Sequence, residues 1–330
     1  MQNDFFKGLV SPETRTLLLE KGAKLVSEDG KEEFTIRDGI ACLLIPGNLN
    51  AEKKHEMKVF DNMKIQNISF FRNSLYDDVM VRISMLINGG SKSKERNIRV
   101  SEMGGGEGHW ARHVMRKFTN ADVFVCDLSF NTLQRSLKPT KRICADATRP
   151  IFERGSIHVA SFWVSLHHFG ECSMREALNE TVYSLSRSGI LILFEPNSKF
   201  FLRKIMYRSR LSEDVYPDEK EQAVNFCDLS KAIESLGMVE VGTYFLNPPY
   251  NPDFVKKLKR WPIYMVAVEI LYRLDKWILT PVFGSLFSNY QNRLKQYFTL
   301  YGLAIYKKKE SLNHTGQNVT LLRSKKQLQE

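Results

Sequence analysis

The hydrophobic pattern of the chain changes at residue 98. From there on, short apolar runs of strand length alternate with segments whose apolar residues recur at helical spacing. The expected strands are Ile98–Met103, Val123–Cys126, Arg142–Ala145, His158–Val164, Ile190–Phe194, Val239–Phe245 and Thr299–Tyr306. The expected helices are His109–Phe118, Asn131–Leu137, Met174–Leu185 and Leu229–Leu236. This alternation predicts an α/β fold with a seven-stranded, Rossmann-like sheet and helices on both faces.

The segments around this alternation differ from it in pattern. The expected units are a small β-rich module at residues 1–47, a helical linker region at 48–97, the α/β domain at 98–306 with insertions at 196–226 and 247–296, and a basic, disordered tail at 307–330. In an open α/β sheet, ligands bind beyond the carboxyl ends of the strands. The first insertion leaves the sheet from that edge, so we expect it to cover a substrate.

Composition and charge narrow the class of protein. Of the 330 residues, 43% are hydrophobic and 26% are charged, which is typical of a packed chain and excludes a disordered one. The net charge of +11 is concentrated in residues 199–210, 251–260 and 307–330. Such local charge predicts contact with an anionic substrate or a lipid surface and disfavours a nucleic-acid partner. Solubility and a disordered tail would explain it equally well.

Cysteine usage and hydropathy indicate where the protein resides. The five cysteines form no CxxC pair, which disfavours a disulfide framework and indicates a reducing compartment. Asp4 and Lys7 leave no apolar core of signal-peptide length at the start of the chain, so we expect a cytoplasmic protein. Charges interrupt the apolar region from Trp261 to Phe287, so it does not predict a spanning helix. Core packing or a homodimer contact explains this region more simply than peripheral membrane contact does.

A glycine-rich turn follows the first strand of the α/β domain. Residues 100–110 read VSEMGGGEGHW, a strand that enters a GxGxG turn and then a helix. A dinucleotide fingerprint requires GxGxxG, and His109 occupies the position of its third glycine. No Gly-Lys-Ser/Thr follows, which excludes a phosphate-binding P-loop. Because any tight turn uses glycine for positive φ, the turn by itself is a weak sign of a ligand site.

Polar residues follow the next three strands. Asp127 ends the second strand, where its carboxylate can accept both hydroxyls of a ribose, although it could instead cap the following helix. Asp146 follows the third strand, and the run Ser165-Leu166-His167-His168 follows the fourth. Parallel strands end at the same edge of a sheet, so these side chains are expected to meet there.

With these motifs, residues 98–306 resemble the class I S-adenosylmethionine-dependent methyltransferases, particularly the small-molecule type of ubiquinone and menaquinone biosynthesis. The resemblance implies S-adenosyl-L-methionine as cofactor. It implies as cofactor-binding residues Glu102, Gly104, Gly106, Gly108, Asp127, Leu128, Asp146, Ala147 and Ser165. In that family the turn packs on the cofactor, the acid after the second strand binds ribose, and the acid after the third contacts the adenine amino group. The chain departs from the family at Ile157-His158, where Phe-Asp is usual, and at Arg187-Ser188-Gly189, where Pro-Gly-Gly is common.

The N-terminal module resembles the zinc-ribbon-like module that precedes some of these domains. Ser11 and Thr14 stand where its metal-binding CxxC would be. Cys42 and His55 are the only Cys and His before position 100, and a structural zinc site needs about four ligands. We therefore expect a degenerate module without a metal.

Methyl transfer from a sulfonium requires mainly that a nucleophile be held in line with the methyl group. A base is needed only for a poorly acidic nucleophile, and His167 and His168 are the candidates by position. The alternative is that one of them caps a helix or only lines the pocket. Arg203 and Lys204, in a basic stretch interleaved with apolar residues, are the candidate substrate-binding residues.

The predicted function is methyl transfer from S-adenosylmethionine to a small-molecule acceptor. The localised positive charge and the insertions predict an anionic acceptor, sugar-linked or lipid-linked. Two alternatives stay open. The chain could methylate RNA or protein, with its tail and basic insertion as the docking surface, or it could be a cofactor-binding domain without catalysis.

Overall fold

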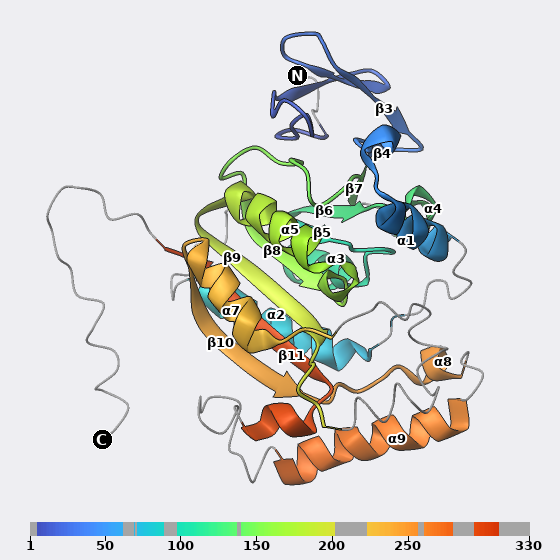
Figure 1. Cartoon of the computed structure of the whole chain (residues 1–330), viewed down its shortest axis with the longest axis vertical. Coiled ribbons are helices and arrows are strands. Elements are labelled where there is room, and N and C mark those ends of the chain that lie inside the picture. Colours follow the sequence, from blue (N-terminus) through green and yellow to red (C-terminus); the bar gives the residue numbers. More distant parts are fainter. Residues whose placement is uncertain are drawn as a thin grey trace, which may run out of the picture.

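The structure is a computed structural model that describes residues 5–61, 69, 71–88, 98–136, 140–201, 223–256, 261–279 and 294–309. Its centre is a twisted, mostly parallel sheet (Figure 1). The seven strands after residue 98 are β5 (Arg99–Met103), β6 (Asp122–Asp127), β7 (Lys141–Cys144), β8 (Ile157–Trp163), β9 (Leu185–Pro196), β10 (Met238–Leu246) and β11 (Tyr301–Lys308). Each strand expected from the hydrophobic pattern is therefore present, with shifted ends.

The strand order makes this sheet Rossmann-like. It runs β7-β6-β5-β8-β9-β11-β10, and the first five strands are parallel, with the outward and return order of a doubly wound sheet. The last strand, β11, enters between β9 and β10 and is antiparallel to both. The order reverses between β5 and β8, so a ligand crevice is expected beyond the carboxyl ends of these two strands.

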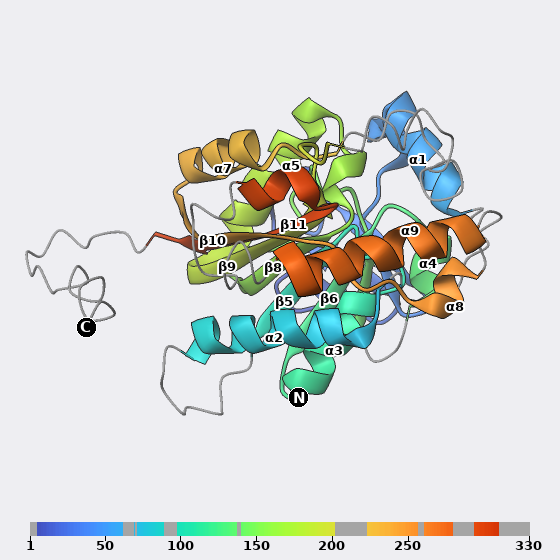
Figure 2. The ribbon, with the colours of Figure 1, turned by 90° about the horizontal axis from the view of Figure 1, so that it is seen from below.

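Helices cover both faces of the sheet (Figure 2). One face carries α2 (Asn73–Asn88), α3 (His109–Lys117) and α4 (Phe130–Arg135), and the other carries α5 (Glu171–Ser184) and α7 (Phe226–Ser235). The expected start of α5 at Met174 is wrong by three residues. Gly170 is its N-cap, and the helix begins at Glu171. The helix α7 also begins three residues before its expected start at Leu229. Its N-cap is Asn225, whose side chain accepts a hydrogen bond from the Cys227 amide.

Four short strands at the N-terminus extend the sheet to eleven strands. They are β1 (Leu18–Lys21), β2 (Lys24–Ser27), β3 (Glu33–Arg37) and β4 (Ile40–Cys42). Each of them pairs in antiparallel orientation with the next one along the chain. β4 pairs in parallel with β7. The β-rich segment is thus continuous with the main sheet through one strand pair.

A polar contact joins the two positions where a zinc ribbon would carry its first CxxC. The Ser11 hydroxyl donates to Oε1 of Glu32 at 2.8 Å, and the Thr14 hydroxyl donates to Oε2 of the same carboxylate at 2.5 Å. Ser11 is buried and also accepts hydrogen bonds from the amides of Glu13 and Thr14. One carboxylate therefore connects this turn to the chain just before β3. In the described part of the chain, no three His, Cys, Asp or Glu side chains are grouped to hold a metal ion.

The two insertions differ in how much of them the structure describes. Most of residues 196–226, including Arg203 and Lys204, lies outside the described residues. The second insertion contains the short helix α8 (Pro252–Val255) and the helix α9 (Trp261–Leu274), which continues into a π-helical turn, Asp275–Leu279. None of the helices described has the length and hydropathy needed to span a membrane.

Candidate functional site

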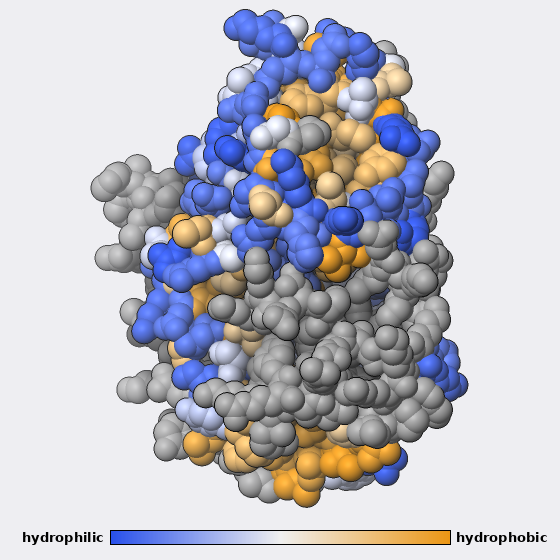
Figure 3. Space-filling model, turned by 45° about the vertical axis from the view of Figure 1, so that its right-hand side comes forward, coloured by the Kyte–Doolittle hydropathy of each residue, from blue (hydrophilic) through white to orange (hydrophobic). Residues whose placement is uncertain are grey.

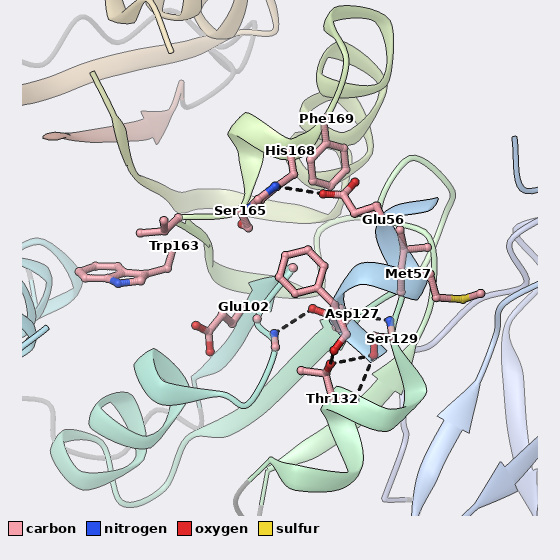
Figure 4. A pocket seen from close by; sticks show the side chains of 18 of the residues that line it. Glu56, Met57, Glu102, Asp127, Ser129, Thr132, Trp163, Ser165, His168 and Phe169 are labelled. Carbon is pink, nitrogen blue, oxygen red and sulfur yellow. Dashed lines mark hydrogen bonds and ion pairs between the residues drawn. The ribbon is translucent and has the colours of Figure 1, made fainter. Parts of the chain in front are cut away.

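A cavity opens where the carboxyl ends of the central strands meet, at the crevice predicted by the strand order. Its walls come from the ends of β5, β6 and β8, from the loop after β7, and from the helix α1 (Ala51–Asp61), which lies across it (Figure 4). Eight of the predicted site residues line this cavity, namely Glu102, Gly104, Gly106, Asp127, Leu128, Ala147, Ser165 and His168. Three others, Gly108, Asp146 and His167, are near it but do not line it.

The glycine turn forms the floor between β5 and α3. Gly104, Gly106 and Gly108 all have positive φ, at 62°, 54° and 71°, which other L-residues adopt only under strain. Gly104 is also restricted by space, because a Cβ atom there would lie 2.7 Å from the Cβ of Ser165. The Ser165 hydroxyl in turn donates to the carbonyl oxygen of Met103 at 2.8 Å. The ends of β5 and β8 therefore approach each other as closely as glycine permits.

Asp127 is held at the end of β6 by two backbone amides. The amide of Gly106 donates to its Oδ2 at 2.9 Å, and the amide of Ser129 donates to its Oδ1 at 2.8 Å. Ser129, not Asp127, is the N-cap of α4, and its hydroxyl accepts from the amide of Thr132. Burial raises the pKa of Asp127 even though both amide contacts favour the charged form. A carboxylate has about four acceptor sites, so the two amides leave capacity for further donors from the cavity.

Glu102 is a second acid in the wall of the cavity. It is buried, and its Oε2 accepts a hydrogen bond of 2.9 Å from the amide of Ala111 in the first turn of α3. Burial raises its pKa to about 8, with the neighbouring charge of Asp127 adding to the effect. At neutral pH the carboxyl group is therefore mostly protonated, and the cavity wall carries less negative charge than the sequence suggests.

The acid after β7 does not line the cavity itself but pairs with a lysine that does. Oδ2 of Asp146 forms an ion pair of 2.7 Å with Nζ of Lys53 on α1, and its Oδ1 accepts from the amide and the hydroxyl of Thr148. Ala147, the next residue, does line the cavity. The predicted pair thus separates, with Ala147 at the cavity and Asp146 tying α1 to the sheet.

The two consecutive histidines after β8 have different surroundings. His168 lines the cavity, and its Nδ1 lies 3.1 Å from Oε1 of Glu56. His167 is buried, and its Nδ1 lies 2.8 Å from Oε2 of Glu195 at the end of β9. The other oxygen of Glu195 accepts from the amides of Ser165 and Leu166, and burial raises the pKa of Glu195 to about 8. His167 therefore belongs to a buried network that shapes the turn, and His168 faces the cavity.

The backbone at the end of β8 is strained. Val164 has φ of 56°, in the left-handed region that β-branched residues rarely adopt, and it lines the cavity between Trp163 and Ser165. The amide of Val164 donates to the carbonyl of Phe194 at 2.7 Å, which holds it there. This conformation turns the chain abruptly from the strand into the turn that carries His168.

The sequence analysis expected a helical region at 48–97 but assigned no role at the cavity to the helix α1, which lies across it. Five residues of α1 line it, which are Glu52, Lys53, Glu56, Met57 and Phe60. Asp61, at the end of α1, accepts a hydrogen bond of 2.5 Å from the Ser129 hydroxyl. The spacing of Glu52, Glu56 and Phe60 indicates one helix face, but no local signal shows what that face covers.

The sequence analysis also did not predict the aromatic side chains that form another wall of the cavity. Trp163 stacks on Trp110 of α3 at 4.8 Å and on Tyr76 of α2 at 5.1 Å between ring centroids. Trp163 and Tyr76 both line the cavity. The spacing of apolar residues on α2 and α3 predicts that each helix has a buried face. It does not indicate that Tyr76 on that face would line a cavity.

Comparisons with known proteins yield a structural likeness alone. No protein-family model matches the sequence, and no curated protein matches it. Among the solved structures, a geranyl diphosphate C-methyltransferase from Streptomyces coelicolor A3(2) matches 80% of this chain and all of its own, at 11% identity and a TM-score of 0.48. A phosphoethanolamine N-methyltransferase 2 from Haemonchus contortus matches 69% of this chain at 14% identity and a TM-score of 0.44. This second match spans 52% of the Haemonchus protein.

Another matching structure is a 4+2 cyclase, SpnF, which covers 78% of this chain at 13% identity and a TM-score of 0.46. Identities and scores this low do not assign an activity to this chain.

Proposed function

We propose that the chain is an S-adenosylmethionine-dependent methyltransferase that acts on a small-molecule acceptor. The observation that carries this proposal is the setting of Asp127, whose carboxylate is fixed by the amides of Gly106 and Ser129 at the wall of the cavity. A carboxylate oriented in this way at the end of the second strand suits the two vicinal hydroxyls of a ribose.

The residues around Asp127 fit the rest of this cofactor. Leu128, Ala145 and Ala147 offer small apolar surface beside the acid, as a flat adenine ring requires. On the other side, Gly104 and Gly106 have no side chains, so a ligand can approach the backbone closely. S-adenosylmethionine carries a sulfonium and an ammonium group, and a cation beside Glu102 would favour the ionised form of that carboxyl.

When bound, the cofactor would supply the methyl group on its sulfonium. We propose that Glu102, the glycine turn, Asp127, Leu128, Ala147 and Ser165 hold it. The role of α1 would be to exclude water, because Met57 and Phe60 cover the cavity between polar contacts at both ends of the helix. His168 would accept the proton of a poorly acidic acceptor, with Glu56 orienting its ring.

For the acceptor, we propose an anionic molecule, sugar-linked or lipid-linked, in a cytoplasmic protein that contacts membranes peripherally. The support is the basic stretch 199–210, with Arg203 and Lys204 as substrate-binding candidates. The described part of the cavity near His168 carries Glu52 and Glu56, and its two cations, Lys53 and Arg135, are paired with Asp146 and Glu107. We therefore propose that the basic stretch supplies the positive charge for an anionic group. An RNA or protein acceptor is the alternative outcome of an acceptor screen.

Calorimetric titration with S-adenosylmethionine tests the proposal. Replacement Asp127→Ala is expected to weaken binding by about 1 to 3 kcal/mol, because two ribose hydroxyls would lose a charged acceptor. The matched control is Asp122→Ala at the opposite end of the same strand, where the acid forms an ion pair with Lys141 at the surface. We expect the control to bind like the wild type. Absence of binding to the wild type would refute the proposal, and equal binding by Asp127→Ala would remove its main support.

A further inference from the structure

The helix α9 presents an apolar face to solvent. Its outer stripe, defined as Val266, Ile270, Leu274, Trp277 and Ile278, is exposed at 60%, 51%, 40%, 70% and 50%, respectively. The spacing of these residues places them along one side of the helix and its π-helical continuation, over about 18 Å. Figure 3 shows one region of apolar surface at the end of the molecule where α9 lies. A contiguous exposed apolar patch of this kind usually marks an interaction site.

The opposite side of α9 is fixed to the protein, so the outer stripe cannot turn inward. Val268 is buried in the same hydrophobic cluster as Phe71 and Tyr250. At the end of the helix, Asp275 is buried, forms an ion pair of 2.6 Å with the buried Lys295, and accepts a hydrogen bond of 2.6 Å from the Asn247 amide. Breaking this buried pair would leave an uncompensated charge, which is costly.

The charges beside the outer stripe are mostly positive. Lys276 lies over the ring of Trp277 at 5.3 Å, and Arg273 is exposed next to Leu274. The acid on this part of the helix, Glu269, is occupied by ion pairs with Arg72 and Arg273. In the sequence, the run Lys-Lys-Leu-Lys-Arg at 256–260 comes directly before α9. An apolar helix face with a tryptophan and basic flanks is the pattern of helices that lie in the interface of a bilayer.

We infer that the outer stripe of α9 docks on a lipid bilayer that contains anionic headgroups. The apolar side chains would enter the boundary between headgroups and acyl chains, while Arg273 and Lys276 would contact lipid phosphates. A second copy of this chain fits less well, because a two-fold contact through the same face would bring these like charges together. Docking there does not depend on methyl transfer, although it would bring a lipid-linked acceptor close to the enzyme.

Vesicle cosedimentation with the full chain tests this inference. The probes are vesicles of phosphatidylcholine alone and vesicles with about 30 mol% phosphatidylglycerol, whose surface potential attracts basic segments. We expect the wild type to sediment with the anionic vesicles and to do so less at high salt, because salt screens the headgroup attraction. The double variant Ile270→Ser/Trp277→Ser should lower the partition coefficient about tenfold or more.

The matched control removes exposed apolar surface elsewhere. Val81 and Met85 on α2 are 43% and 68% exposed, and the variant Val81→Ser/Met85→Ser should bind vesicles like the wild type. Cofactor titration of the Ile270→Ser/Trp277→Ser variant should match the wild type, which separates this inference from the proposed function and shows that the variant is folded.

Two results would overturn the inference. One is failure of the wild type to sediment with anionic vesicles, whatever the variants do. The other is equal sedimentation by the wild type and the Ile270→Ser/Trp277→Ser variant. Light scattering tests the competing occupant, a second copy of the chain. The stripe would be a dimer contact if the wild type were a dimer that does not bind vesicles and the Ile270→Ser/Trp277→Ser variant were a monomer.

Discussion

Oε1 of Glu56 lies 3.1 Å from Nδ1 of His168, so α1 is joined across the cavity to the turn that follows β8. The same helix is held by Lys53, which pairs with Asp146, and by Asp61, which accepts from Ser129. The three contacts connect one helix from the region before residue 98 to loops after three different strands. Access to the cavity therefore depends on a helix whose sequence carries no motif.

His168→Gln is expected to lower kcat by a factor of roughly 10² to 10⁴ with a poorly acidic acceptor, because the proposed base would be lost. Its cofactor affinity should remain close to that of the wild type, because the ribose contact proposed for Asp127 is untouched. Steady-state kinetics and calorimetry measure the two quantities. Unchanged kcat would show that His168 only lines the cavity. The neutral variant Glu56→Gln should lower kcat less, since it alters only the orientation of the ring.

Gly104→Ala should abolish cofactor binding and destabilise the fold, because the new Cβ would lie 2.7 Å from that of Ser165. Gly22→Ala provides the control, since Gly22 has a similar φ of 65° but nothing within 4 Å of an added Cβ. Both variants should lose about 1 to 2 kcal/mol of stability, because a non-glycine residue is placed in the left-handed backbone conformation. Urea unfolding should give a larger loss for Gly104→Ala. Equal losses would mean that the contact with Ser165 relaxes freely.

The raised pKa of Glu102 makes the stability of the protein depend on pH. In the folded chain this carboxyl keeps its proton up to a pH of about 8, whereas an unfolded chain releases it near 4.5. The folded state therefore binds more protons between these values, and its stability falls as the pH rises, by up to about 1.4 kcal/mol per pH unit for one group. Above about 8 the effect is constant.

Glu102→Gln should flatten this dependence, because the amide does not titrate and can still accept from the Ala111 amide. Glu195, with its pKa also near 8, contributes a similar slope in both proteins, so the difference between the two curves isolates Glu102. Urea unfolding at pH 5, 6, 7 and 8 provides the measurement. Parallel curves for the wild type and the variant would show that Glu102 ionises normally.

The N-terminal segment should be stabilised by Glu32 and not by a metal. Glu32→Ala removes the acceptor of the buried Ser11 hydroxyl and of Thr14, and is expected to cost about 1 to 3 kcal/mol. The neighbouring Glu33→Ala breaks an exposed ion pair with Lys24 and should cost about 0 to 1 kcal/mol. Thermal unfolding measures both. A chelator should leave the melting temperature unchanged, and a loss of stability on chelation would contradict this account.

Local patterns were sufficient to predict the seven strands after residue 98, but not the pairing of β4 with β7 that extends the sheet to eleven strands. Each strand after residue 98 is an apolar run bounded by turns, so its existence depends on neighbours in the sequence and is readable there. The glycine turn is readable for the same reason, because the backbone conformations at Gly104 and Gly106 require glycine. The position of Asp127 at the cavity was also predictable, since the end of a parallel strand determines on which edge of the sheet it lies.

What faces the cavity was decided by tertiary packing. His167 and His168 are adjacent and chemically identical, and only the strained turn at Val164, together with the buried carboxyl group of Glu195, determines which of them enters the cavity. Asp146 likewise turns to Lys53, a residue 93 positions away. The docking of α1 and the exposure of the outer stripe of α9 depend on the surfaces these helices meet. A helical pattern specifies which residues share a face, and only the packed structure determines whether that face meets a sheet, a cavity or solvent.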